Sequence, residues 1–200
     1  MKRNPPICSL ISMLAAMLIS LPAQSEEHID NTALQAEAID IVRQFGGTLK
    51  PLLKEAIATG GLNHAVDICS TQAPQIARQL SKESDWSVKR VSLKPRNTLG
   101  ATADSFERKV LQEFDQRQLA GELPEKMIYA ETTATQFRFM KAQGVDGLCL
   151  NCHGEVISGD VKNALQRYYP DDVATGYSLG QVRGAFSLTK TLTNDRPSQQ

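Results

Sequence analysis

Five residues in the last third of the chain, Cys149 to His153, form the pattern Cys-x-x-Cys-His. Two thiols at this spacing can each form a thioether with a vinyl group of haem, and the imidazole that follows reaches the iron from one face. The pattern therefore predicts a single covalent haem c. Cys149 and Cys152 would attach it, and His153 would be the proximal iron ligand.

Two other interpretations fit the spacing less well. A zinc site could combine Cys149, Cys152 and His153 with Cys69, but the ligands of zinc sites typically come in spaced pairs, without an imidazole directly after the second thiol. A thioredoxin-like thiol pair lies between a strand and a helix of a βαβ unit, and the glycines that flank this motif do not indicate such a setting.

Covalent haem attachment of this type requires export, and the N-terminus indicates export independently. Two basic residues precede an apolar stretch over residues 7–21, and the small residues Ala23 and Ser25 follow. The stretch is interrupted by serines and is short for a membrane span, which is typical of a cleaved secretory signal. We predict a signal peptide over residues 1–25 with cleavage near Ser25, a periplasmic location, and a mature product that is not an integral membrane protein.

Composition fits one domain after cleavage. The 200-residue chain has 22 Lys and Arg against 22 Asp and Glu, and two of the basic residues lie in the signal, so the mature charge is about −2. This balance does not indicate nucleic acid as a partner. We predict one domain over residues 26–193, large enough to enclose a core, and a flexible tail over residues 194–200.

Hydrophobic spacing predicts an α+β domain. A long N-terminal amphipathic helix, bent near its middle by glycines and a proline, should end at Gly60-Gly61, and further helices should follow over residues 62–80, 104–118 and 160–168. Strands are predicted over residues 86–93, 126–131, 136–142 and 182–192, and loops over residues 94–103 and around the haem motif. In the third strand Phe137 and Phe139 should share one face, with Arg138 and Met140 on the other.

The residues alone leave several candidates for the ligand on the second face of the iron. The candidates are His28, His64, Cys69, Met127, Met140 or water. Cys69 lies on the apolar stripe of the second predicted helix, whereas His64 points about 140° away at 100° per residue. A methionine is more often a gap-filler in a core, and Cys69 could equally be a small buried side chain. Cys69 is, however, the one cysteine that belongs neither to the predicted signal peptide nor to the haem motif.

Basic residues beside these segments could bind the haem propionates. Arg96 and Arg183 are the main candidates, with Arg90 and Lys94 nearby in the sequence. Arginine pairs well with carboxylates because its planar guanidinium donates two parallel hydrogen bonds. Tyr177 and Phe186 could pack on the ring.

Four segments, residues 65–69, 90–97, 149–154 and 176–187, resemble a family of exported single-haem proteins with a PAS-like domain. The resemblance spans roughly residues 33–189. It implies a PAS-like antiparallel sheet flanked by helices, a covalent haem, and axial ligation by histidine and cysteine. Matched onto this chain, the histidine is His153 and the distal cysteine is Cys69.

The resemblance favours a redox or diatomic-gas sensing module, and a low-potential periplasmic electron carrier is the alternative. A thiolate ligand stabilises ferric iron, so it lowers the reduction potential. The expected partners are haem and a redox or signalling protein. We do not expect an enzyme, because no acid/base pair is evident for the distal side.

Overall fold

The computed structural model describes residue 1 and residues 30–192. Apart from residue 1, the predicted signal peptide lies outside the described residues, as does the predicted C-terminal tail. In the described part a long helix, α1 (Asn31–Ser84), precedes a sheet formed by β1 (Trp86–Val91), β2 (Ile128–Thr132), β3 (Gln136–Gly144) and β4 (Val182–Thr191). Helices α2 (Thr98–Ala101), α3 (Ser105–Leu119), α4 (Leu150–His153) and α5 (Gly159–Tyr168) lie between the strands, with a 3₁₀ turn at Pro124–Lys126.

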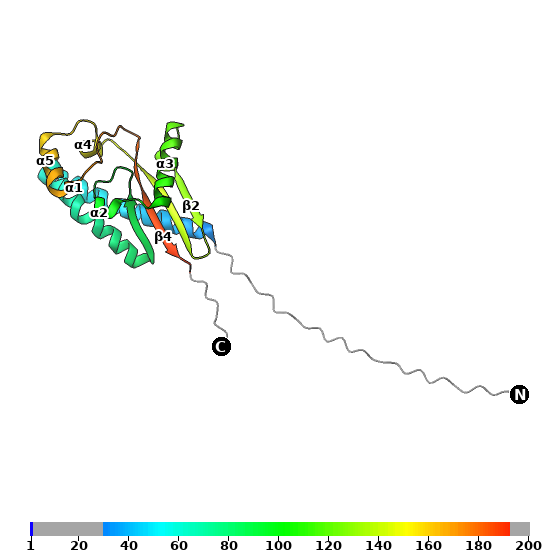
Figure 1. Ribbon diagram of the computed structural model, residues 1–200. Helices are drawn as coiled ribbons and strands as arrows, with labels where there is room; N and C mark the ends of the chain where they lie inside the picture. The colour runs from blue at the N-terminus through cyan, green and yellow to red at the C-terminus, as the bar shows by residue number, and fades with distance from the viewer. Residues whose placement is uncertain (2–29, 193–200) are drawn as a thin grey trace.

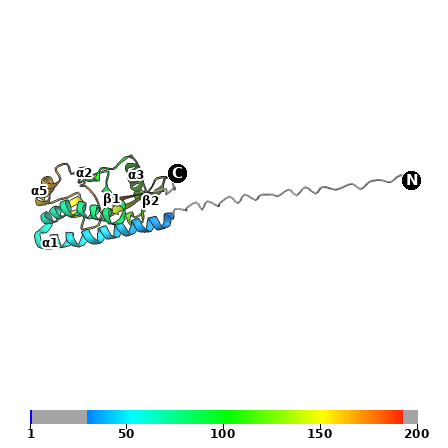
Figure 2. The same ribbon diagram turned by 90° about the horizontal axis from the view of Figure 1, so that it is seen from below.

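Helix α1 is a hairpin of two arms that meet at Gly61. The φ of Gly61 is 70°, a conformation that glycine adopts without steric cost, and the second arm turns back along the first (Figure 2). The break between two helices at Gly60-Gly61 is therefore confirmed. The bend predicted near Gly46, Gly47 and Pro51 is wrong, because the backbone stays helical there and changes direction only at Gly61.

The four strands form one antiparallel sheet in the order β1-β4-β3-β2. Its two faces are covered by different helices, with the α1 hairpin on one side and α3 on the other (Figure 1). Alternation along β3 assigns Phe137 and Phe139 to the α1 side and Met140 to the α3 side, as predicted. The α+β fold with an antiparallel sheet flanked by helices is confirmed.

Two local predictions need correction. The haem motif was expected in a loop, but Leu150–His153 form the single helical turn α4. The predicted loop over residues 94–103 also contains a short helix, α2. The helix predicted from residue 104 does begin there, because Asp104 caps α3: its side chain accepts from the Glu107 backbone N–H at 2.8 Å, and the Glu107 carboxylate accepts from the Asp104 N–H at 2.9 Å.

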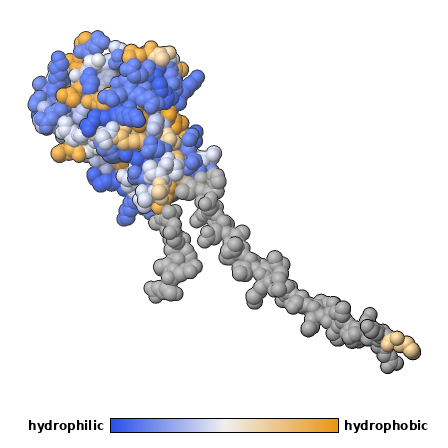
Figure 3. Space-filling model, turned by 45° about the vertical axis from the view of Figure 1, so that its right-hand side comes forward, coloured by the Kyte–Doolittle hydropathy of each residue, from blue (hydrophilic) through white to orange (hydrophobic). Residues whose placement is uncertain are grey.

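The outer surface mixes polar and apolar side chains. Figure 3 shows hydrophilic residues over most of the visible face, with hydrophobic residues in separate areas. None of the helices in the described part of the chain is both long and apolar enough to cross a membrane.

Candidate functional site

Asp146 shapes the turn that carries the Cys-x-x-Cys-His motif. Its Oδ1 accepts hydrogen bonds from the backbone N–H of Leu148 at 3.1 Å and of Cys149 at 3.3 Å, and from the Cys149 thiol at 3.1 Å. Burial, and then the bond to Asp146, raise the pKa of Cys149 to about 11. In the described part of the chain Cys69, Cys149 and Cys152 are all free of disulfides, so both thiols of the motif are available for covalent chemistry.

The His153 ring is fixed by backbone contacts. Its Nδ1 lies 2.7 Å from the Ala174 carbonyl oxygen, and the Tyr177 N–H donates to the His153 carbonyl at 2.9 Å. Arg183 Nε lies 3.2 Å from the same Nδ1; we assign the Nδ1 proton to the shorter Ala174 contact. Burial, helped by Arg183 and Arg96, lowers the pKa of His153 to about 2. The imidazole is therefore neutral, with its metal-binding lone pair on Nε2.

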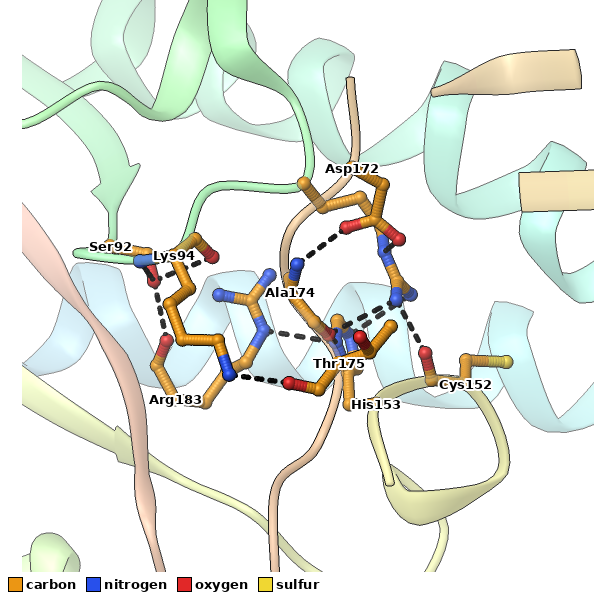
Figure 4. A network of polar contacts seen from close by, with 9 residues as sticks. Ser92, Lys94, Cys152, His153, Asp172, Ala174, Thr175 and Arg183 are labelled. Carbon is orange, nitrogen blue, oxygen red and sulfur yellow. Dashed lines mark hydrogen bonds and ion pairs between the residues drawn. The ribbon is translucent and has the colours of Figure 1, made fainter. Parts of the chain in front are cut away.

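Arg96 ties the motif to the segment after α5, and Figure 4 labels three of the residues that it contacts, Cys152, Asp172 and Ala174. Its Nε donates to Asp172 Oδ2 at 3.0 Å, and its Nη2 donates to the carbonyl oxygens of Cys152 and Ala174. Its Nη1 lies 3.3 Å from His153 Nε2. The side chains of Arg96 and Asp172 are only 10% and 7% exposed, so the ion pair is shielded from water.

Cys69 and His153 line the same cavity, although they are 84 positions apart in the sequence. This cavity, of about 110 Å³, is also lined by Arg96 and Arg183, the two predicted propionate contacts. Burial raises the pKa of Cys69, and the guanidinium groups nearby act in the opposite direction. The structure therefore brings together the predicted axial pair and the predicted arginines.

A second cavity of about 380 Å³ borders the first through Arg90 and Gln143 and reaches Cys149. Its apolar wall includes Phe45 and Phe186, whose rings meet edge to face with centroids 5.1 Å apart. Phe186 therefore lines a cavity that also reaches Cys149, one of the two predicted attachment points. Tyr177 instead contacts the His153 ring edge-on, at a centroid distance of 6.3 Å.

The other candidate iron ligands lie elsewhere. His64 is exposed, in a polar cleft between α1 and α5, with its Nδ1 4.0 Å from Asp67. Met127 and Met140 are fully buried in the core between the sheet and α3. His28 lies outside the described residues. Over residues 30–192 no three His, Cys, Asp or Glu side chains are grouped to hold a metal ion.

Several residues at the site were not found by sequence reasoning. Phe45 lies within the predicted N-terminal helix, where nothing sets it apart from its apolar neighbours. Nothing in the pattern around Tyr169, Asp172 or Ala174 indicates that a loop returns them to the motif. Tyr169 lines the cavity with Cys69, and burial raises its pKa to about 12. The one available signal was Asp146, three residues before Cys149, a spacing typical of a side chain that caps a helical turn.

A family model described as Tll0287-like matches residues 20–190. The chain belongs to the Tll0287-like family. Among solved structures, the crystal structure of the cyanobacterial haem protein Tll0287 matches with a TM-score of 0.62 and 21% identity; the match covers 82% of this chain and 98% of that one. No curated protein sequence matches the chain. At this identity the likeness establishes a shared fold.

Proposed function

We propose that this member of the Tll0287-like family binds one haem c, attached through Cys149 and Cys152, with His153 and Cys69 as its iron ligands. A similar protein, Tll0287, is described as a haem protein. The observation that carries the proposal is the shared cavity, in which a neutral imidazole and a thiol lie together beside the motif.

The side chains around the cavities fit haem chemically. Arg90 and Arg183 are mostly buried, and within residues 30–192 neither has a carboxylate partner. Buried guanidinium groups favour anionic partners, and haem carries two propionates. Phe45, Leu49 and Phe186 provide apolar surface for the ring. Binding of iron to His153 Nε2 also requires the Arg96 guanidinium to move away from that nitrogen.

A bound haem would supply an iron that exchanges one electron and can take a diatomic ligand at an open position. The chain's own residues then set its properties. Ala174 orients His153, the arginines compensate the negative charge of the propionates, and the Cys69 thiolate favours the ferric state. Cys69 should bind ferrous iron less tightly, because the reduced metal carries one positive charge fewer to hold the thiolate.

We propose that this release makes the protein a periplasmic redox or diatomic-gas sensing module. The specific support is that Cys69 lies on α1, whereas the motif ends in α4. Cys69 can therefore dissociate from the iron without breaking the covalent attachment of the haem. Electron transfer at low potential is the second candidate, favoured by a ligand pair that can keep the iron six-coordinate.

Absorption spectra of the exported protein test the ligand assignment. We expect Cys69→Ala to change the ferric spectrum, whereas Ser70→Ala, the adjacent residue whose hydroxyl bonds its own helix at 2.8 Å, should not. An unchanged spectrum for Cys69→Ala would remove this residue from the iron. Addition of CO to the reduced wild type then separates the two roles: a spectral shift supports sensing, and no shift supports the electron carrier.

A further inference from the structure

Tyr169 is held beside Cys69 by both its backbone and its ring. At the end of α5 its N–H donates to the Leu165 carbonyl at 2.7 Å, and its own carbonyl accepts from the Asp172 N–H at 3.0 Å. The ring packs in the apolar cluster that includes Val66 of α1. Residues three positions apart on a helix share a face, so Val66 and Cys69 lie on adjacent turns of one side of α1. Tyr169 therefore contacts the side of α1 that carries Cys69.

The Tyr169 side chain lines the cavity that also contains Cys69 and His153. Burial, and then the negative charge of a Cys69 thiolate, raise the pKa of Tyr169 to about 12, so the phenol oxygen lies close enough to the sulfur for the two to interact. Within residues 30–192 no hydrogen bond is formed by this oxygen. Because a phenol is protonated at neutral pH, its O–H is a free donor beside the predicted distal ligand.

A hydrogen-bond donor on the second face of the iron decides which small ligands are held there. A donor stabilises a diatomic ligand whose outer atom carries negative charge, because the hydrogen bond is then charge-assisted. Carbon monoxide gains little, since its outer atom stays nearly neutral. Asn97 and Gln143 also bring side-chain amides to the lining, so a test has to remove the Tyr169 hydroxyl alone.

We propose that Tyr169 selects the diatomic ligand that takes the place of Cys69: its hydroxyl donates a hydrogen bond to the outer atom of that ligand and so favours dioxygen over carbon monoxide. The inference rests on the proposed function in one respect, since it requires a haem iron between His153 and Cys69. It does not require that Cys69 dissociates in the wild type, because replacing Cys69 opens the same position.

Infrared spectra of the reduced, exported protein with carbon monoxide test the proposal in the Cys69→Ala background. A hydrogen bond to the ligand oxygen lowers the C–O stretching frequency even where the affinity hardly changes. We expect the further substitution Tyr169→Phe to raise this frequency. Tyr168→Phe is the matched control and should leave the frequency unchanged, because Tyr168 is 38% exposed and lines the polar cleft that contains His64. An unchanged frequency in Tyr169→Phe, or no carbon monoxide binding in Cys69→Ala, would overturn the proposal.

Dissociation rates in the same background measure the selectivity. Tyr169→Phe should speed the release of dioxygen about tenfold, as expected for the loss of one hydrogen bond to a partly charged atom, and the release of carbon monoxide by less than about twofold. Equal acceleration for both ligands would show that the tyrosine only limits space, and would contradict the proposal.

A solvent-isotope measurement decides the matter if Tyr169→Phe does not fold. In Cys69→Ala the C–O frequency should shift on transfer to D₂O, because the donor is an exchangeable O–H; no shift would overturn the proposal. Failure of the proposed function is visible separately. If carbon monoxide binds Cys69→Ala but not the reduced wild type, the sensing role fails while the result for Tyr169 stands.

Discussion

The sheet and the segment from Val145 to Gln181 are held in place by different forces. The sheet is covered on both faces by apolar side chains from α1 and α3. The segment carries the haem motif and has only small apolar clusters, one around Val161 and Leu165 and one around Val145 and Tyr177. Polar contacts complete its attachment, among them those of Arg96 with Asp172 and with the carbonyl oxygens of Cys152 and Ala174. Apolar burial is spread over many side chains, whereas a polar contact depends on one. Single substitutions should therefore disturb the two regions differently.

The largest effect is expected in the apolar region. Phe45 is 1% exposed and packs against Phe186, so Phe45→Ala should lower the free energy of unfolding by about 3–5 kcal/mol. Chemical denaturation measures this loss, and Phe45→Leu, which leaves a smaller cavity, should lose less. Equal losses for the two variants would contradict the expectation that the loss grows with the size of the cavity left behind.

A smaller and local effect is expected from Arg96→Ala. The substitution leaves the Asp172 carboxylate buried without its partner. Breaking a buried ion pair in this way should lower the free energy of unfolding by roughly 3 kcal/mol. Hydrogen exchange should accelerate across residues 145–181 and not in β3 or β4. The double variant Arg96→Met with Asp172→Leu removes both charges, so it should recover part of the protection against hydrogen exchange in this segment. Acceleration throughout the sheet would contradict the division into two regions.

The boundary between the regions can be tested at Gly184, just after Arg183. A Cβ at this position would lie 2.4 Å from the Val91 carbonyl oxygen, so Gly184→Ala should cost about 1–3 kcal/mol of stability as the strands shift apart. Gly47→Ala is the control, since nothing lies within 4 Å of its Cβ; in a helix interior it should gain about 0.5–1 kcal/mol. Thermal or chemical denaturation of both variants shows whether Gly184→Ala lowers the free energy of unfolding while Gly47→Ala raises it.

The smallest effect is expected at the cap of α3. Asp104→Ala removes a capping side chain and should cost about 1 kcal/mol. Burial alone would raise the pKa of Asp104, but the bond from the Glu107 backbone and the contact with Arg138 lower it overall. A lowered pKa means that the stabilisation is present at neutral pH and is lost as the pH falls through the acidic range. The stability difference between wild type and variant should therefore shrink in acid; a constant difference would count against the ionised cap.

The apolar region could be predicted from the sequence because its evidence is periodic. The alternation of Phe137, Arg138 and Phe139 assigns faces to β3, and the helical spacing of Val110 and Phe114 marks the inner face of α3. The bend in α1 was misplaced because Gly46, Gly47 and Pro51 weaken a helix locally, whereas packing on the sheet keeps both arms helical. Tertiary contacts can override local propensity in this way.

The candidate site could be predicted only in part. The Cys149 to His153 spacing is local, so it is visible in the sequence. The positions of Tyr169, Asp172 and Ala174 depend on how the chain returns after α5, and no periodic pattern describes that path. Arg96 was expected to face the propionates, and its bonds to backbone carbonyls could not be read from residue types.

Intact-mass measurement after acid–organic extraction of the exported, mature protein tests the central claim most directly. We predict that the polypeptide keeps its colour and carries the added mass of one haem, and that Cys149→Ala with Cys152→Ala gives a colourless chain of the bare polypeptide mass. A wild-type protein that releases all its pigment on extraction, or that never carries any, would contradict the account.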